Sequence, residues 1–288
     1  MPFLNGSEEN VVCSGLKSER QGRVMLFRFL SVFVVVMTVS VALADDQYDE
    51  LQSIGKIEAL GGKISRDDDL PGHPVVGINL RRSKRIRDGY LHLLRAFPKL
   101  TSLNLSGTQI TDDGVIHLLE FRTLTSLNLS NTRITNDGLK RLHELENLSS
   151  LDLSKNAITD AGIADLSLLK NLTTLELGVT WISDNGLSQL VDMKKLSTLG
   201  LWKTQITDAG LKELQNMKSL KVLVLSGTKV SDDGLQELTC MKALLRLHLD
   251  DTSVTDAGVK DLKKSLPQLE IPLPKIEMDN PMLHKVIE

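Results

Sequence analysis

Seven consecutive segments of this chain share one 24-residue pattern, and this repetition constrains the fold more than any other feature. The pattern reads L-x-x-L-x-L-x-x-T-x-I-T-D-x-G-L-x-x-L, and the last segment carries one additional residue near Pro267. A chain with such a period stacks one small unit many times, and each unit contacts only its neighbours. The segments begin at Leu100, Leu124, Leu148, Leu172, Leu196, Leu220 and Leu244.

Each segment predicts one strand followed by one helix. The alternation places Leu103 and Leu105 on the inner side of a short parallel strand and Asn104 on its outer side. Leucines three residues apart, such as Leu211 and Leu214, predict a helix with one buried side. This period and leucine spacing are typical of leucine-rich-repeat solenoids. We therefore predict an α/β fold: a right-handed solenoid, or horseshoe, with a parallel concave sheet, convex helices and an N-terminal helical cap.

Three further positions of each coil have structural interpretations. Thr or Asn at the ninth position turns the chain, and its polar group must bond the backbone, so stacked copies predict a ladder along the solenoid. Asp at the thirteenth position is expected to cap the helix. A glycine follows two residues later, and we expect any side chain there to collide with the neighbouring coil. The ninth positions are Thr108, Thr132, Asn156, Thr180, Thr204, Thr228 and Thr252. The helix-start residues are Asp112, Asn136, Asp160, Asp184, Asp208, Asp232 and Asp256.

The repeats occupy one of four parts of the chain. Apolar residues at every third position of 48–60, followed by Gly61 and Gly62, predict a short cap helix ended by glycine. Pro272 is expected to stop further strand pairing. The predicted parts are an N-terminal extension and signal peptide (1–44), an N-terminal cap and turn-rich connector (45–74), the solenoid (75–271, with a degenerate first coil at 75–99 and seven coils from 100) and a C-terminal tail (272–288).

The segment Phe29–Ala44 predicts export. It is an apolar run of 16 residues that follows Arg28 and ends in Ala-Leu-Ala, which is typical of a secretory signal with cleavage near Ala44. Such a run is shorter than the roughly 20 residues that span a bilayer, although an uncleaved anchor remains an alternative. Met25 is a second candidate start. We therefore expect a secreted, periplasmic or cell-envelope protein without a membrane span after cleavage.

Composition argues against several functions. The net charge is -3 and aromatic residues make up 3%, so the concentrated basic stripe of a nucleic-acid-binding protein is missing. Cleavage would leave Cys240 as the single cysteine, with no positioned base to activate it. No zinc motif is present, and the acidic pairs lack the spacing of calcium-binding solenoids. We therefore predict no catalysis, no cofactor and no metal site.

Function is expected at the variable positions of the concave strand face. Its first half is small and polar, with Asp152 and Glu176 as an acidic centre, whereas its second half is apolar. Both tryptophans lie in the second half, within expected reach of one another because adjacent strands are about 4.8 Å apart. Exposed Trp beside apolar residues is typical of protein-binding hot spots, and local packing of each ring on its neighbour is the alternative. The candidate partner-binding residues are Asp152, Glu176, Val179, Trp181, Trp202, Val222, Val224 and His248.

The T-x-I-T-D-x-G-L-x-x-L half of each coil carries a family resemblance. With the segment 57–64 (IEALGGKI), it resembles secreted or envelope leucine-rich-repeat proteins of bacteria. It is also similar to the repeat half of F-box leucine-rich-repeat proteins and GALA effectors, but the chain has no F-box-like segment, and Thr replaces their recurrent strand-end Cys. With the predicted signal, we expect an exported module, monomeric, that binds a protein on its strand face. A structural spacer and a substrate-receptor adaptor of a ubiquitin ligase are the alternatives.

Overall fold

The computed structural model describes residues 49–272. The chain divides into two compact units, Met1–Gln52 and Ser53–Glu288, and the second contains every repeat. The predicted signal peptide, the start at Met25, the cleavage site near Ala44 and most of the tail lie outside the described residues. In the part of the chain that the structure describes, no helix has both the length and the apolar character needed to cross a bilayer.

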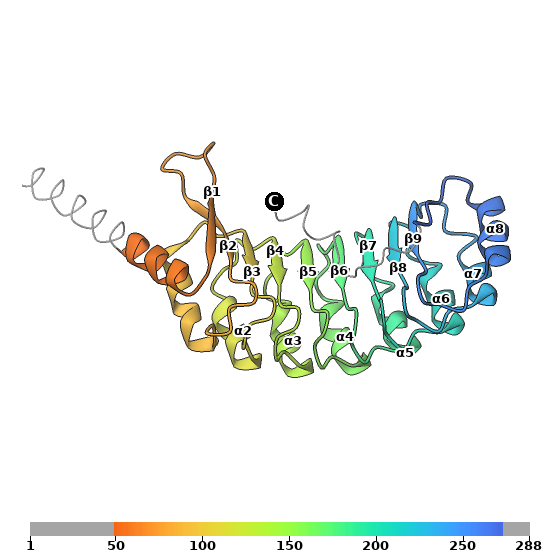
Figure 1. Cartoon of the computed structure of the whole chain (residues 1–288), viewed down its shortest axis with the longest axis horizontal. Helices are drawn as coiled ribbons and strands as arrows, with labels where there is room; N and C mark the ends of the chain where they lie inside the picture. Colours follow the sequence, from red (N-terminus) through yellow and green to blue (C-terminus); the bar gives the residue numbers. More distant parts are fainter. Residues whose placement is uncertain (1–48, 273–288) are drawn as a thin grey trace, which may run out of the picture. The chain divides into compact units, whose positions relative to one another are not determined.

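The repeats build a nine-stranded sheet with the strands in chain order. Helices follow strands β2 to β9 and lie along one side of the sheet (Figure 1), and the coil of β6 carries two, α5 and η2. The strands are β1 Lys63–Arg66, β2 Val75–Asn79, β3 Ser102–Asn104, β4 Ser126–Asn128, β5 Ser150–Asp152, β6 Thr174–Glu176, β7 Thr198–Gly200, β8 Val222–Val224 and β9 Arg246–His248. The helices are η1 Asp88–Ala96, α2 Asp112–Leu118, α3 Asn136–Leu142, α4 Asp160–Leu166, α5 Asp184–Leu187, η2 Ser188–Leu190, α6 Asp208–Leu214, α7 Asp232–Glu237 and α8 Asp256–Ser265.

Strands β2 to β9 are parallel and in register, so equivalent residues of successive coils face one another. This confirms the predicted leucine-rich-repeat solenoid of strands and helices. The first strand differs, because β1 lies within the segment predicted to be a connector and pairs antiparallel with β2. A polar four-residue strand is a weak signal in a sequence, and pairing with β2 decides its conformation.

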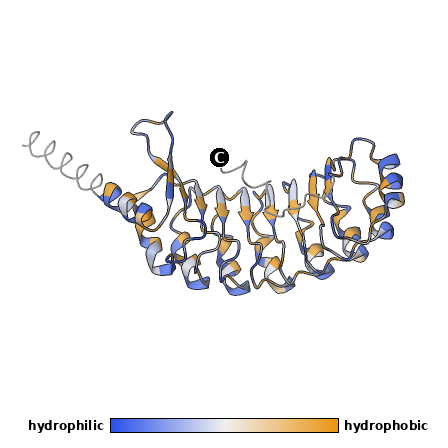
Figure 2. Ribbon diagram, in the orientation of Figure 1, coloured by the Kyte–Doolittle hydropathy of each residue, from blue (hydrophilic) through white to orange (hydrophobic). Residues whose placement is uncertain are grey.

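The N-terminal helix and the core match the sequence pattern. Residues 49–59 are helical, and Gly61 follows with φ +83, the left-handed conformation that glycine adopts at a helix end. Leu103, Leu211 and Leu214 are buried, as their spacing predicted. Figure 2 shows hydrophobic residues recurring along the coils, because each coil adds the same set of leucines to one continuous core.

The repeated aspartates join adjacent coils, which corrects their predicted role as helix caps. The cap residue is the preceding Thr or Ser, and Thr207 illustrates this by accepting a hydrogen bond from the Ala209 amide. Asp184 instead accepts hydrogen bonds from the Thr207 amide (2.9 Å) and hydroxyl (2.6 Å) of the next coil. The same arrangement joins Asp208 to Ser231. The aspartates from Asp112 to Asp232 therefore tie their own helix start to the start of the helix that follows.

The invariant glycines make room for these aspartates. A Cβ on Gly138 would lie 2.5 Å from Oδ1 of Asp112, and one on Gly162 would lie 2.6 Å from Oδ1 of Asn136, both in the preceding coil. These contacts confirm the predicted collision between coils. The glycine is required by the carboxylate or amide of a neighbour rather than by its own backbone conformation.

The ninth-position residues bond the backbone, but mostly within one coil. The hydroxyl of Thr204 donates to the Leu201 carbonyl, and Thr228 bonds Leu225 in the same way. Asn156 has a longer side chain, and its amide group reaches the Leu129 carbonyl of the preceding coil at 2.8 Å. The predicted bond to the backbone is confirmed, whereas a ladder between coils forms at Asn156 and not at these threonines.

Candidate functional site

The outward residues of β4 to β9 form one continuous surface, which we call the strand face. The parallel register aligns the last residue of each of these six strands in one row. Five of the eight predicted partner-binding residues lie on β5, β6, β8 or β9 of this face, and Trp202 follows β7 by two residues. Val179 and Trp181 lie in the turn after β6. The row is Asn128, Asp152, Glu176, Gly200, Val224 and His248.

The first half of the strand face is a network of polar groups that bond one another. The Asn128 amide donates to Oδ2 of Asp152 at 3.0 Å, and the Ser154 backbone amide donates to Oδ1 at 2.9 Å. The Ser130 hydroxyl donates to Oδ1 of Asn128. Burial raises the pKa of Asp152, and the hydrogen bonds from Ser154 oppose that rise. Asp152 is therefore buried and bonded, and its predicted exposure is corrected.

Glu176 is also buried, although the sequence placed it at an exposed acidic centre. Its side chain crosses Gly200 of the next coil, where a Cβ would occupy the same space as the carboxylate. The side chain is 0% exposed, and neither carboxylate oxygen has a hydrogen-bond partner among the described residues. Burial, and then the nearby charge of Asp152, raises the pKa of Glu176 to about 8. The group is therefore mainly uncharged at neutral pH, and the acidic centre carries less charge than the sequence suggests.

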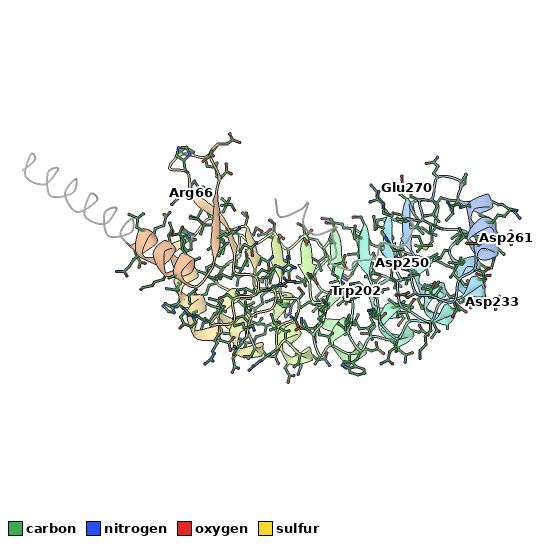
Figure 3. All side chains as sticks on the ribbon, in the orientation of Figure 1. Arg66, Trp202, Asp233, Asp250, Asp261 and Glu270 are labelled. Atoms are coloured by element: carbon green, nitrogen blue, oxygen red, sulfur yellow. The ribbon has the colours of Figure 1, made fainter. Side chains whose placement is uncertain are left out.

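The two tryptophans have different surroundings. Trp202, labelled in Figure 3, is half-buried, and its indole lies over Gly178 of the preceding coil. The Lys155 ammonium lies 5.4 Å from the centre of the Trp202 ring, within range of a cation–π interaction. This fits the alternative of local packing for Trp202. Trp181 is 64% exposed, which local packing does not account for.

The second half of the strand face is apolar and partly exposed. Val222 and Val224 are half-buried on β8, beside Arg246 and His248 of β9. Val179 is 38% exposed in the turn that leads to Trp181. The structure therefore places Trp202, Val222 and Val224 on one surface and Val179 with Trp181 beside it.

Sequence reasoning missed three contributors to this surface. Gly178 and Gly200 provide the space into which Trp202 and Glu176 fold, and Lys155 lies against the Trp202 ring. The two glycines could have been noticed, because they interrupt columns that carry larger residues in most other coils. Nothing in the sequence indicated the role of Lys155, because its contact with Trp202 depends on the orientation of the Trp202 side chain.

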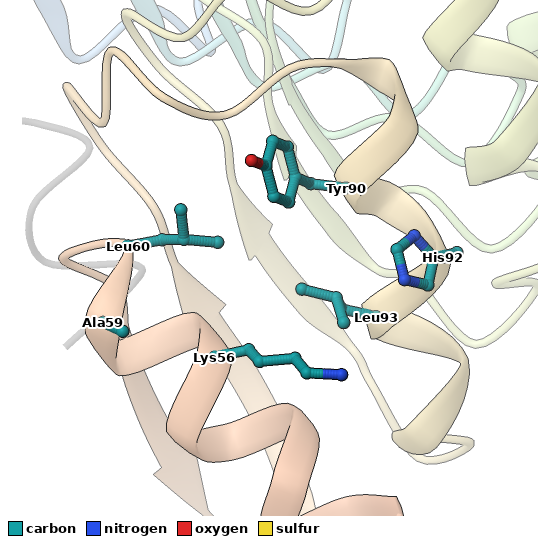
Figure 4. A pocket seen from close by; sticks show the side chains of 6 residues that line it. All are labelled: Lys56, Ala59, Leu60, Tyr90, His92 and Leu93. Carbon is teal, nitrogen blue, oxygen red and sulfur yellow. The ribbon is translucent and has the colours of Figure 1, made fainter.

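Two pockets lie away from the strand face. One, of about 380 Å³, lies between the end of the N-terminal helix and η1, and it is almost entirely apolar (Figure 4). The other, of about 480 Å³, lies beside the exposed Cys240. Among residues 49–272, no group of three or more His, Cys, Asp or Glu side chains is placed to hold a metal ion. The first pocket is lined by Lys56, Ala59, Leu60, Tyr90, His92 and Leu93.

Comparisons with known proteins agree with this fold. The family model described as Leucine Rich repeat matches residues 98–119, 122–142, 144–167 and 216–238. These matches and the stacked coils show a leucine-rich-repeat fold. A search of curated protein sequences gives no match.

Solved structures of two bacterial internalins are similar to this chain. An internalin (inlF) from Listeria monocytogenes is 24% identical over 72% of this chain and 55% of its own, with a TM-score of 0.54. An internalin C2 (inlC2) from the same organism is 25% identical over 69% of this chain and 81% of its own, with a TM-score of 0.55. The chain thus spans about half the length of the first internalin. These similarities support a leucine-rich-repeat protein of bacterial type.

Proposed function

We propose that this protein is exported, catalyses no reaction and binds a protein partner on the second half of its strand face. The observation that carries the proposal is the cluster of Trp202, Val222 and Val224, which present partly exposed apolar side chains at outward positions. In the coils that begin at Leu100 and Leu124 the equivalent positions hold serines and asparagines, among which Ser130 bonds Ser106 and Asn128. Apolar side chains that lie outside the core and are partly exposed are typical of binding surfaces.

Two further considerations support the proposal. Leucine-rich-repeat proteins commonly bind other proteins, because a stack of short strands offers a broad surface whose residues vary without disturbing the core. Export is supported by the apolar run before Ala44, which lies outside the described residues. Export also removes the chain from the ubiquitin machinery, so we favour an extracellular partner over the adaptor role.

Site-specific photo-crosslinking tests the binding surface. Benzoylphenylalanine replaces Val224 in one sample and Lys212 of α6, on the helix side, in a matched control, each in the cells that naturally produce the protein. We expect a single adduct from position 224 and none from position 212. The adduct's partner, once purified, should then bind Val224→Asp at least tenfold more weakly than wild type.

The contrary outcome favours the spacer role. Failure to crosslink at position 224, together with unchanged partner affinity of Val224→Asp, would remove the strand face as a binding site. Export is tested separately by fusing alkaline phosphatase after residue 60, because the enzyme needs an oxidising compartment to form its disulfides. Phosphatase activity from this fusion, but not from one lacking residues 1–44, is the expected result.

A further inference from the structure

The turn after β6 carries a patch of exposed apolar side chains that are not part of the hydrophobic core. Val179 is 38% and Trp181 is 64% exposed, and both belong to the same turn. The residues at the position of Val179 in the coils before and after are Lys155 and Lys203. We call these four residues the rim patch.

Val179 adopts a backbone conformation that valine normally avoids. Its φ is +55, in the left-handed region, where a β-branched side chain crowds its own backbone. The other coils place glycine or a polar residue at this position, so Val179 is the only apolar residue in the row. Its side chain is 38% exposed, so burial offsets the strain only in part. A strained residue with a partly exposed apolar side chain points to a role in binding. The row is Arg82, Gly107, Asn131, Lys155, Val179, Lys203, Gly227 and Asp251.

Basic side chains flank the apolar centre on both sides. The backbone amides of Lys155, Val179 and Lys203 each donate to a carbonyl of the following coil, at 2.8, 2.8 and 2.7 Å. Lys155 and Lys203 therefore lie about 5 Å to either side of Val179. Arg133 and Lys229 occupy the position of Trp181 two coils before and two coils after it. All four basic residues are exposed, and none forms an ion pair within residues 49–272.

The carboxylates at the neighbouring helix starts bond the adjacent coils and form no ion pair with the lysines of the rim patch within residues 49–272. Asp160 and Asp184 accept hydrogen bonds from the Ser183 and Thr207 amides and hydroxyls between coils, which holds them at the helix starts. Glu176, the acidic residue closest in sequence, is buried across Gly200. The surface thus combines an apolar centre with positive charge on both sides.

We propose that the rim patch binds an acidic polypeptide segment that contacts Trp181 and Val179 with an apolar side chain while its carboxylates pair with Lys155 and Lys203. This inference rests on the proposed function and specifies its partner. The two lysines are about 10 Å apart. In an extended peptide, side chains four residues apart lie on one side about 13 Å apart with a third side chain between them, within reach of two flexible lysines on either side of an apolar centre. A protein segment fits better than a nucleic acid, because a nucleic acid needs a longer basic stripe than four basic residues around an apolar centre.

A peptide-binding assay with purified full-length protein tests the inference. The probes are fluorescein-labelled peptides Glu-Glu-Leu-Glu-Glu, its counterpart with lysines in place of the glutamates, and its counterpart with Ala in place of Leu. Fluorescence anisotropy should give at least tenfold tighter binding of the first peptide than of either counterpart. The affinity should fall as NaCl rises, because exposed charges are screened by salt.

Matched variants locate the binding to the rim patch. Lys155→Glu/Lys203→Glu and Trp181→Ala should each weaken binding at least tenfold. Lys170→Glu/Lys212→Glu makes the same charge change on the helix side and should bind within twofold of wild type. Val179→Gly should raise the unfolding midpoint, because it relieves the left-handed valine, and should weaken peptide binding. Equal affinity for the acidic and basic peptides, or no effect of the Lys155→Glu/Lys203→Glu change, overturns the inference.

The outcomes separate this inference from the proposed function. If the acidic peptide fails to bind while position 224 still crosslinks to a partner, the strand-face function stands and the acidic partner is rejected. If the peptide binds through the rim patch while position 224 crosslinks to nothing, the strand-face function fails and the rim patch alone is the site.

Discussion

Asp208 joins two adjacent coils, and this explains why Asp, or Asn136 in one coil, recurs together with Gly along the repeats. Its carboxylate accepts hydrogen bonds from the Ser231 amide (2.7 Å) and hydroxyl (2.6 Å) of the next coil. Gly234 lies beside it, with no side chain in the way. Aspartate and glycine are therefore one structural device that spans two coils, although they are 26 residues apart in the chain.

The variant Gly234→Ala tests this device. Alanine normally stabilises a helix by up to about 1 kcal/mol relative to glycine. Here the added Cβ would collide with the Asp208 carboxylate and lie 3.0 Å from its Cα, which cannot move aside easily. We expect the free energy of unfolding to fall by about 1–3 kcal/mol, as in overpacked cores, measured by urea denaturation.

Two comparisons isolate the cause. Gly89→Ala, in η1, meets no atom within 4 Å and should leave stability unchanged or slightly increased. In an Asp208→Ala background, Gly234→Ala should cost less, because the collision with the carboxylate is gone and only the contact with the Cα of residue 208 remains. Equal losses at positions 89 and 234 would contradict the proposed collision.

At the scale of the strands, β5 to β7 bring two carboxyl groups into a sheet face that excludes water from both. Asp152 faces Glu176 in the parallel register, and Gly200 continues the row. The raised pKa of Glu176, about 8, means that the folded protein holds a proton that the unfolded chain releases above its ordinary pKa of 4.5. Folding stability is therefore linked to pH through this side chain.

The pH dependence has a definite sign. Below about pH 4.5 the raised pKa of Glu176 makes its full contribution to the free energy of unfolding. This contribution is lost as the pH rises to about 8, by at most about 1.4 kcal/mol for each pH unit. The raised pKa of Asp152 acts in the same direction. Glu176→Gln keeps the shape and removes the titration. We expect its stability relative to wild type to increase from pH 5 to pH 8, measured by urea midpoints.

A control variant distinguishes burial from a general charge effect. Glu213→Gln removes a carboxylate from the exposed side of α6 and should follow the wild-type pH profile. A Glu176→Gln profile that also runs parallel to wild type would show that Glu176 titrates normally in the folded protein.

At the scale of the whole molecule, each coil is an exchangeable unit. Removing residues 124–147 brings Asp112 opposite Thr159, which is equivalent to its present partner Thr135. Because the coils interact with nearest neighbours, we expect this deletion variant to fold with a lower urea midpoint and a smaller m-value. It should still bind the acidic peptide, since the rim patch is intact.

Deletion of residues 172–195 is the matched test of function. It removes the same number of residues and brings Asp160 opposite Thr207, but it takes away Val179 and Trp181. We expect loss of peptide binding, and lower stability than in the first deletion variant, because Ser154 replaces Gly178 beside the Trp202 indole. Loss of cooperative unfolding in both deletion variants would contradict the nearest-neighbour description, and loss of binding in both would place the site elsewhere.

The strand face shows where sequence reasoning stops. Val222 and Val224 were predicted on this surface and lie there half-buried, because alternation along a strand fixes which side each residue takes. Asp152 and Glu176 follow the same alternation, yet both are buried. Their burial depends on where the side chain turns and on what the next coil offers, and alternation carries no information on either.

The sequence by itself determined the number of coils, their strand and helix order, the leucines of the core and the glycines that meet a neighbouring coil. These follow from a pattern in which every contact joins equivalent positions of adjacent coils. The tertiary structure decided the antiparallel β1, the reach of each aspartate to the next coil, the fold of Glu176 across Gly200 and the left-handed Val179 between two lysines. These features depend on side-chain directions and on differences between neighbouring coils, which appear only when the coils are stacked.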